Sequence, residues 1–126
     1  MREIRQRMDR MLAFAELEPF ANLKLKHFSS GMSARLAYAV AFEAVREVLV
    51  LDEVFAVGDA GFKARCEARY RELRAAGRTV VIVSHDPPII SAFCDRALLL
   101  VDGRIAMEDT PATVVDGYLA SLANHA

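Results

Sequence analysis

The chain has 126 residues, enough for one domain with a real core and too few to expect two. It is 54% apolar and 26% charged, as in a soluble globular domain, and its 16 basic and 17 acidic residues leave a net charge of -1. This balance argues against a nucleic-acid surface or a membrane-binding polybasic patch, and no apolar run approaches the ~20 residues of a membrane-spanning helix.

The first half of the chain predicts two helices and a strand. Apolar residues recur at helical spacing over 3–17, which predicts an amphipathic helix, and a loop over 19–29 follows. A second helix is expected over about 31–45. The apolar run at 48–53, "VLVLDE", predicts a buried strand, and "VGDAG" at 57–61 predicts a turn.

The second half continues the alternation of helices and strands. We expect a helix over 62–76, a buried strand over 79–86, a short helix from Pro87 to about Cys94, a hairpin over 97–108 and a last helix over about 111–122. The dipeptide Asp102-Gly103 suits the type I′ turn of the hairpin. Buried strands joined through helices predict an α/β domain with parallel strands, whose ligands gather beyond the carboxyl ends of the strands.

The two cysteines, Cys66 and Cys94, do not have the spacing of zinc ligands. Two buried thiols in a reducing cytosol are expected instead. The charged N-terminal segment "MREIRQRMDR" lacks the apolar core of a signal peptide.

Reactive side chains follow both central strands. Asp52 and Glu53 end the first, and such a pair can hold a hydrated magnesium ion and orient or deprotonate a water. His85 follows the second, where it could contact a γ-phosphate or the attacking water. Taken singly, the acids favour a turn cap beside a solvated carboxylate, and a lone histidine favours a structural role. Their coincidence at two strand ends favours a site.

The stretch "KHFSSGMSARLAYAVAF", residues 26–42, opens a helix with two serines and a glycine. Ser29 and Ser30 are both preferred capping residues, and Gly31 lets the backbone approach a ligand closely. The free N–H groups and partial positive charge of a helix start suit a phosphate. On its own, the stretch favours plain helix capping.

In this order the motifs resemble the second half of an ATP-binding cassette (ABC) ATPase. "FSSGM", 28–32, is similar to the signature motif of the family, and "VLVLDE" to its Walker B strand. "AVGD", 56–59, stands where the D-loop belongs, and "VSHD", 83–86, resembles the switch region. The resemblance spans essentially the whole chain and implies the fold of the C-terminal part of a P-loop NTPase, with a partial parallel sheet flanked by helices and a C-terminal hairpin.

The resemblance also implies roles for single residues. Asp52 would help to hold Mg²⁺ through a water molecule, Glu53 would be the catalytic base and His85 the γ-phosphate sensor. The signature residues Ser29, Ser30, Gly31 and Met32, followed by Arg35, would contact the ATP of a second cassette in trans, and Asp59 would be the D-loop acid.

The variant form of the motifs is most similar to ATP-binding subunits that export bacterial polysaccharide, such as O-antigen, capsule or teichoic acid. That resemblance implies a homodimer of cassettes, a separate membrane permease subunit, ATP and Mg²⁺ as cofactors, and a cytoplasmic location on the inner face of the membrane. It implies no nucleic-acid partner.

The sequence contains no Walker A motif, G-x-x-x-x-G-K-[ST], because none of its three lysines follows a glycine. The chain therefore looks like the C-terminal portion of a cassette, with the end of the helical subdomain and its signature helix over about 1–45 and part of the catalytic core over about 46–126. We expect it to be inactive alone and to expose part of its sheet.

Two other functions remain open from the sequence. One is a non-transport ABC-type ATPase of DNA repair or chromosome structure, although the long coiled coils expected there are absent from this sequence. The other is a non-catalytic fragment or interaction module derived from an ABC ATPase.

Overall fold

A computed structural model describes residues 1–53 and 58–125, and these divide into two compact units, Met1–Val81 and Ile82–Ala126. The first unit contains the helices α1 (Arg2–Ala15), α2 (Ser30–Ala44) and α3 (Ala60–Ala75) and the strand β1 (Val48–Asp52). Strand β2 (Thr79–Val83) begins in the first unit and ends in the second. The predicted order of helices and strands is confirmed.

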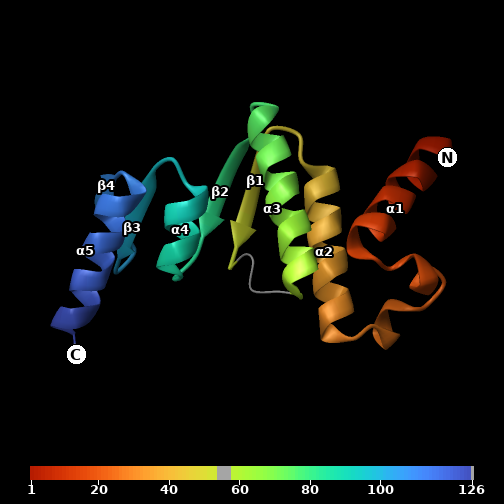
Figure 1. The fold of residues 1–126 in the computed structure, drawn as a ribbon, viewed down its shortest axis with the longest axis horizontal. Helices are drawn as coiled ribbons and strands as arrows, with labels where there is room; N and C mark the ends of the chain where they lie inside the picture. Colours follow the sequence, from red (N-terminus) through yellow and green to blue (C-terminus); the bar gives the residue numbers. More distant parts are fainter. Residues whose placement is uncertain (54–57, 126) are drawn as a thin grey trace. The chain divides into compact units, whose positions relative to one another are not determined.

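Helix α2 lies between α1 and α3 in the first unit (Figure 1). The connection from α1 to α2 contains two short 3₁₀ turns, η1 (Glu18–Phe20) and η2 (Leu25–His27), in place of the featureless loop expected there. Ala15, Leu17 and Ala39 are buried at the centre of the packing between α1 and α2. Partly buried apolar side chains surround them: Met11, Leu12, Phe14, Phe28, Met32 and Leu36.

Strands β1 and β2 are hydrogen-bonded neighbours in a two-stranded sheet. The N–H of Thr79 donates to the carbonyl of Glu47 at 2.9 Å, so the strands begin side by side, as parallel strands do. Leu49 and Leu51 are buried, whereas Val48 and Val50 are 57% and 63% exposed. Successive side chains of a strand point to opposite faces, so the prediction of a fully buried strand is wrong for one face. The expected exposure of part of the sheet is confirmed.

The ends of three elements differ from the sequence prediction for local reasons. Helix α3 begins at Ala60 because the Asp59 carboxylate accepts the N–H of Phe62. Helix α1 ends at Ala15, where Glu16 takes a left-handed backbone conformation. Strand β2 stops at Val83 because the chain turns at the next residue, where the Ser84 hydroxyl accepts the N–H of Asp86.

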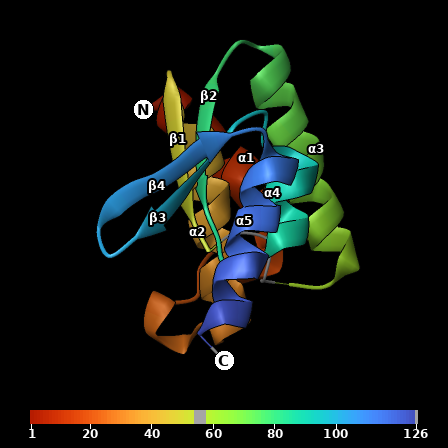
Figure 2. The same cartoon turned by 90° about the vertical axis from the view of Figure 1, so that its left-hand side faces the viewer.

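The second unit contains the helix α4 (Pro87–Phe93), an antiparallel hairpin of β3 (Ala97–Val101) and β4 (Arg104–Asp109), and the helix α5 (Pro111–Asn124). Figure 2 shows the hairpin and α5. Asp102 and Gly103 both have a positive φ, 49° and 75°, as the predicted type I′ turn requires. Thr110 caps α5 by accepting the N–H of Thr113.

The described part of the chain has no helix with the length and hydrophobicity needed to cross a bilayer. Of the two thiols predicted to be buried, Cys66 is buried and Cys94 is only partly so. Burial raises the pKa of the Cys66 thiol to about 11, which suits a structural thiol.

Candidate functional site

The start of α2 carries the four signature-like residues. Ser29 is the N-cap, and its hydroxyl accepts the N–H of Met32 at 3.1 Å. Ser30 and Gly31 follow in the exposed first turn, while the Met32 side chain packs against the buried cluster between α1 and α2. A β-carbon placed on Gly31 would meet only the Ser29 hydroxyl, at 3.9 Å. The packed Met32 thus holds one side of the turn, and the other residues face solvent.

Asp52 and Glu53 lie at the carboxyl end of β1, and both are exposed. Glu53 has a φ of 54°, a left-handed conformation that is uncommon for a residue with a side chain. The chain therefore turns sharply directly after the strand. Two adjacent carboxylates result, one on the last strand residue and one on the turn. No group of three residues able to hold a metal ion occurs in 1–53 and 58–125.

Asp59 is the N-cap of α3, with its Oδ1 accepting the N–H of Phe62 at 2.9 Å. Phe62 is only 1% exposed, so this cap is anchored by a buried ring. The first two residues of the D-loop-like stretch "AVGD", Ala56 and Val57, lie outside the described residues. Gly58 is described and has a φ of 89°.

His85 is exposed and lies in the turn directly after β2, between Ser84 and Asp86, which are joined by the Asp86 N–H to Ser84 Oγ hydrogen bond of 3.0 Å. It belongs to the unit Ile82–Ala126, whereas Ser29, Asp52, Glu53 and Asp59 belong to Met1–Val81. Within the first unit, the predicted residues thus occupy two helix starts and one strand end.

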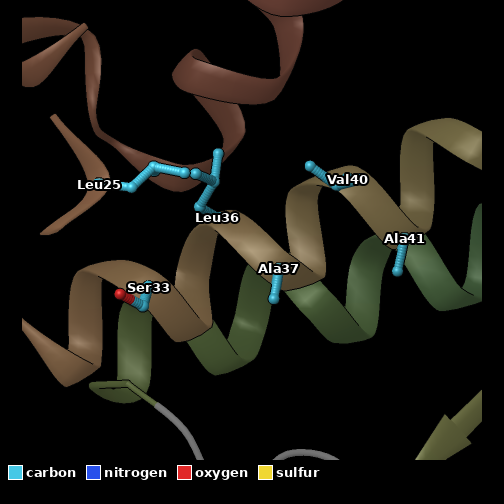
Figure 3. A pocket seen from close by; sticks show the side chains of 6 residues that line it. All are labelled: Leu25, Ser33, Leu36, Ala37, Val40 and Ala41. Carbon is cyan, nitrogen blue, oxygen red and sulfur yellow. The ribbon is translucent and has the colours of Figure 1, made fainter. Parts of the chain in front are cut away.

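A hollow of about 480 Å³ lies along α2, beyond the signature-like turn. Figure 3 shows the side chains that line it, five from α2 and one from η2: Leu25, Ser33, Leu36, Ala37, Val40 and Ala41. Ser33 supplies the one polar side chain of this lining. The hollow includes none of the predicted site residues and lacks the charged groups that a nucleotide would need.

Sequence reasoning missed an ionic cluster that joins the three helices of the first unit. Arg65 of α3 donates to the carbonyl oxygens of Ala13 and Phe14, at 3.0 and 3.1 Å, and its Nη2 lies 3.1 Å from Glu16 Oε1. Arg35 of α2 places Nη1 3.8 Å from Glu16 Oε2. The contacts join residues about 20 to 50 positions apart, so no local pattern reveals them.

A second ion pair joins α1 to α2. Arg10 donates from both Nε and Nη2 to one carboxylate oxygen of Glu43. This hydrogen bond lowers the pKa of Glu43 below its ordinary value, which is the sign expected for a carboxylate held beside a guanidinium. The pair lies near the C-terminal end of α2 and supports the packing of the helices away from the signature-like turn.

No family model matches the chain. Among curated proteins, it is 39% identical over 117 residues to the ABC transporter protein AbcA of Aeromonas salmonicida, covering 93% of this chain and 38% of that protein. It is 33% identical to the O-antigen export system ATP-binding protein RfbB of Klebsiella pneumoniae, covering 97% and 50%. It is 33% identical to the teichoic acids export ATP-binding protein TagH of Lactococcus lactis, covering 93% and 25%. The chain thus spans half or less of these relatives.

Solved structures agree with the sequence relatives. The dimeric structure of a post-hydrolysis state of an ATP-binding cassette, bound to ADP and Pi, matches 87% of this chain and 48% of its own, with a TM-score of 0.73 and 30% identity. The structure of an ATP-binding subunit of an ABC transporter matches 94% of this chain and 54% of its own, with a TM-score of 0.82. Its sequence identity is 22%, so this match supports a conclusion about the fold alone.

These comparisons confirm both the predicted resemblance and the predicted fold class. The chain is therefore a homologue of the ATP-binding proteins of bacterial O-antigen and teichoic acid export systems, and it has the fold of part of an ABC ATPase cassette.

Proposed function

We propose that the chain is part of the ATP-binding component of a bacterial polysaccharide exporter, which couples ATP binding and hydrolysis to transport by a membrane permease subunit. The observation that carries the proposal is the exposed, serine-capped start of α2 in a chain whose relatives are export ATP-binding proteins. A capped helix start with solvent-facing small residues offers N–H groups to a phosphate of another molecule.

The residues of the first unit have the chemistry that such a role needs. Asp52 offers an exposed carboxylate at a strand end, the type of ligand that Mg²⁺ takes directly or through water. Glu53, on the adjacent turn, can accept a proton from an attacking water. In the second unit, exposed His85 can donate a hydrogen bond to a γ-phosphate oxygen.

The signature-like residues Ser29, Ser30, Gly31 and Met32 act in this proposal on ATP held by a second cassette, and Asp59 contributes the D-loop carboxylate. The partners are accordingly a second cassette and a permease, at the cytoplasmic face of the membrane. The division into the end of a helical subdomain, about 1–45, and part of a catalytic core, about 46–126, belongs to the same proposal.

The sequence has no Walker A motif, so the main phosphate cradle has to come from residues other than these 126. We therefore expect the purified 126-residue chain to release no phosphate from ATP above background in a steady-state assay. Turnover that Glu53→Gln abolishes would contradict this expectation.

The function itself is tested in a chimera in which this chain replaces the 122 aligned residues of the Klebsiella RfbB protein. We expect ATP hydrolysis by the chimera and its loss in the Glu53→Gln variant, because the substitution removes the proposed proton acceptor and leaves the shape of the side chain. A folded chimera that binds ATP without hydrolysing it overturns the catalytic assignment.

The exposed, serine-capped start of α2 also fits a second candidate, a non-catalytic module that presents Ser29 and Gly31 to the nucleotide of another cassette. Its test is ATP-dependent co-purification of the 126-residue chain with a complete RfbB-type cassette carrying a Glu-to-Gln block in its own catalytic base. Co-purification that Gly31→Asp abolishes supports this candidate, and failure to co-purify with ATP counts against it.

A further inference from the structure

The residue after α1, Glu16, is held in place by its neighbours along the chain. Ala15 and Leu17 are both fully buried, at 0% exposure, and Glu16 between them has φ 56° and ψ 41°. Its own N–H donates to Ala13 O, and the N–H of Leu17 donates to Leu12 O. These bonds close the end of α1, so the Glu16 carboxylate projects from a fixed point on the backbone.

Two arginines from different helices meet this carboxylate. Arg65 of α3 lies 3.1 Å from one oxygen and also donates to the carbonyls of Ala13 and Phe14. Arg35 of α2 lies 3.8 Å from the other oxygen. Each arginine is the sixth residue after the N-cap of its helix, Ser29 for α2 and Asp59 for α3. The end of α1 therefore contacts both helices at the same distance from their starts.

Aromatic packing joins the same three helices beside the ionic cluster. The Phe14 ring of α1 meets Phe42 of α2 and Phe62 of α3 edge-on, with centroids 5.6 and 5.8 Å apart. Phe62 is the residue whose N–H is bound by the Asp59 cap. Because the ring is buried, a shift of α3 relative to α1 would move the Asp59 cap with it.

From these contacts we infer that Arg65 is a positioning residue, which, through Glu16 and Arg35, sets the start of α3 relative to the start of α2. Its guanidinium uses two nitrogens for three acceptors, a fork that a lysine ammonium cannot reproduce. The side chains of Arg65 and Glu16 are 45% and 50% exposed, so the ion pair itself adds little to stability and its effect is chiefly on geometry.

This inference rests on the proposed function in one respect: the two helix starts are the signature-like and D-loop-like elements of a cassette. If both must reach one nucleotide site, their mutual spacing decides whether Ser29 and Asp59 can act together. Arg65 touches neither element directly and acts through the end of α1.

The test measures the distance between the two helix starts without needing activity. Spin labels are attached to cysteines introduced at exposed Ser30 and Lys63 in the 126-residue chain, with Cys94 replaced by serine and Cys66 by alanine. Pulsed electron resonance then gives the distribution of label distances. We expect one narrow distance in this background and a broadened or displaced distribution after Arg65→Lys or Glu16→Gln.

Arg71→Ala is the matched control, because Arg71 pairs within α3 itself, with its Nη2 3.8 Å from Oε2 of Glu67. Circular dichroism checks that each variant is folded. Arg65→Lys retains the positive charge at this position, so it remains usable as a test if Arg65→Ala does not fold. An unchanged distribution in Arg65→Lys and Glu16→Gln overturns the inference.

The RfbB chimera separates this inference from the proposed function. There we expect Arg65→Lys to lower kcat and leave KM for ATP nearly unchanged, since Arg65 does not contact nucleotide. A chimera without ATPase activity defeats the proposed function, while the spin-label result still decides the role of Arg65.

Discussion

At the scale of single residues, left-handed backbone marks the places where the chain must turn between elements. Among the described residues, Glu16, Glu53 and Asp102 adopt it with a side chain present, and Gly58, Gly77 and Gly103 adopt it without one. Glu16 ends α1, Asp102 opens the hairpin turn, and Glu53 follows β1. A non-glycine residue in this region costs of order 1 kcal/mol, which the surrounding packing has to offset. Glu53 is therefore held in a conformation that an unconstrained glutamate rarely adopts.

Gly58 and Gly77 allow a matched test of this backbone cost. A β-carbon on Gly58 would lie 2.8 Å from Cδ1 of buried Phe62, whereas one on Gly77 would meet nothing within 4 Å. We expect Gly77→Ala to lower the free energy of unfolding by about 1 kcal/mol, the cost of the positive φ alone. Gly58→Ala should lower it by about 2 to 4 kcal/mol, because the ring or the turn must also move.

Urea titrations of the two variants against the parent chain measure this difference. Equal losses would show that Phe62 yields easily and that its packing does not fix the turn before α3. A loss confined to Gly58→Ala would show that the left-handed conformation at Gly77 is nearly free of cost.

At the scale of elements, capping residues determine where the helices begin. Ser29 accepts the N–H of Met32, whereas Ser30 is the first helical residue of α2. We expect Ser29→Ala to destabilise the chain by about 1 kcal/mol, because it leaves a helix N–H without its partner, and Ser30→Ala to have an effect below about 0.5 kcal/mol. Thermal unfolding followed by circular dichroism distinguishes the two. A larger effect of Ser30→Ala would mean that the cap lies one residue later than in the structure.

The same locality explains which elements could be predicted from the sequence. The cap of α2, the Asp102-Gly103 turn and the start of α5 at Thr110 each depend on residues within about four positions of one another. The order of the motifs likewise lies in the sequence, and it identified the fold and the kind of relative. Position along the chain was enough to place Asp52, Glu53 and His85 at strand ends.

Contacts between distant residues could not be predicted in this way. The Arg65–Glu16 pair joins α3 to the end of α1, and nothing near either residue distinguishes it from other surface charges. The exposure of Val50 could not be predicted either. The strand sequence "VLVLD" is apolar at every position before its final acid, so it shows no alternation of apolar and polar residues that would mark an exposed face. Which face of such a strand is covered depends on the helices that pack against it.

At the scale of the whole molecule, one face of β1 is an apolar surface without a cover in the described chain. Val48 and Val50 are 57% and 63% exposed, while Leu49 between them is 6% exposed. Exposed apolar strands favour association with other chains. The two faces of one strand therefore have opposite tolerance for polar substitution.

We expect Val50→Thr to reduce self-association and to change the free energy of unfolding by less than about 0.5 kcal/mol, since threonine keeps the branched shape suited to a strand. Leu49→Thr should cost about 3 kcal/mol, because it leaves a gap and buries a hydroxyl. Light scattering at increasing concentration reports association, and urea titration reports stability. Unchanged association in Val50→Thr would indicate that this face does not drive contacts between copies.

The close packing of α5 on the hairpin has a chemical consequence. A β-carbon on Gly117 would lie 2.8 Å from Cε and 3.2 Å from Sδ of Met107, so helix and strand meet around this thioether with little free space. Peroxide converts a thioether to a sulfoxide, which is larger, polar and in need of hydrogen-bond donors. At Met8, which is 53% exposed, that oxygen would project into water. At Met107 it would enter the contact between α5 and β4, which makes this residue the place where oxidative damage loosens the second unit.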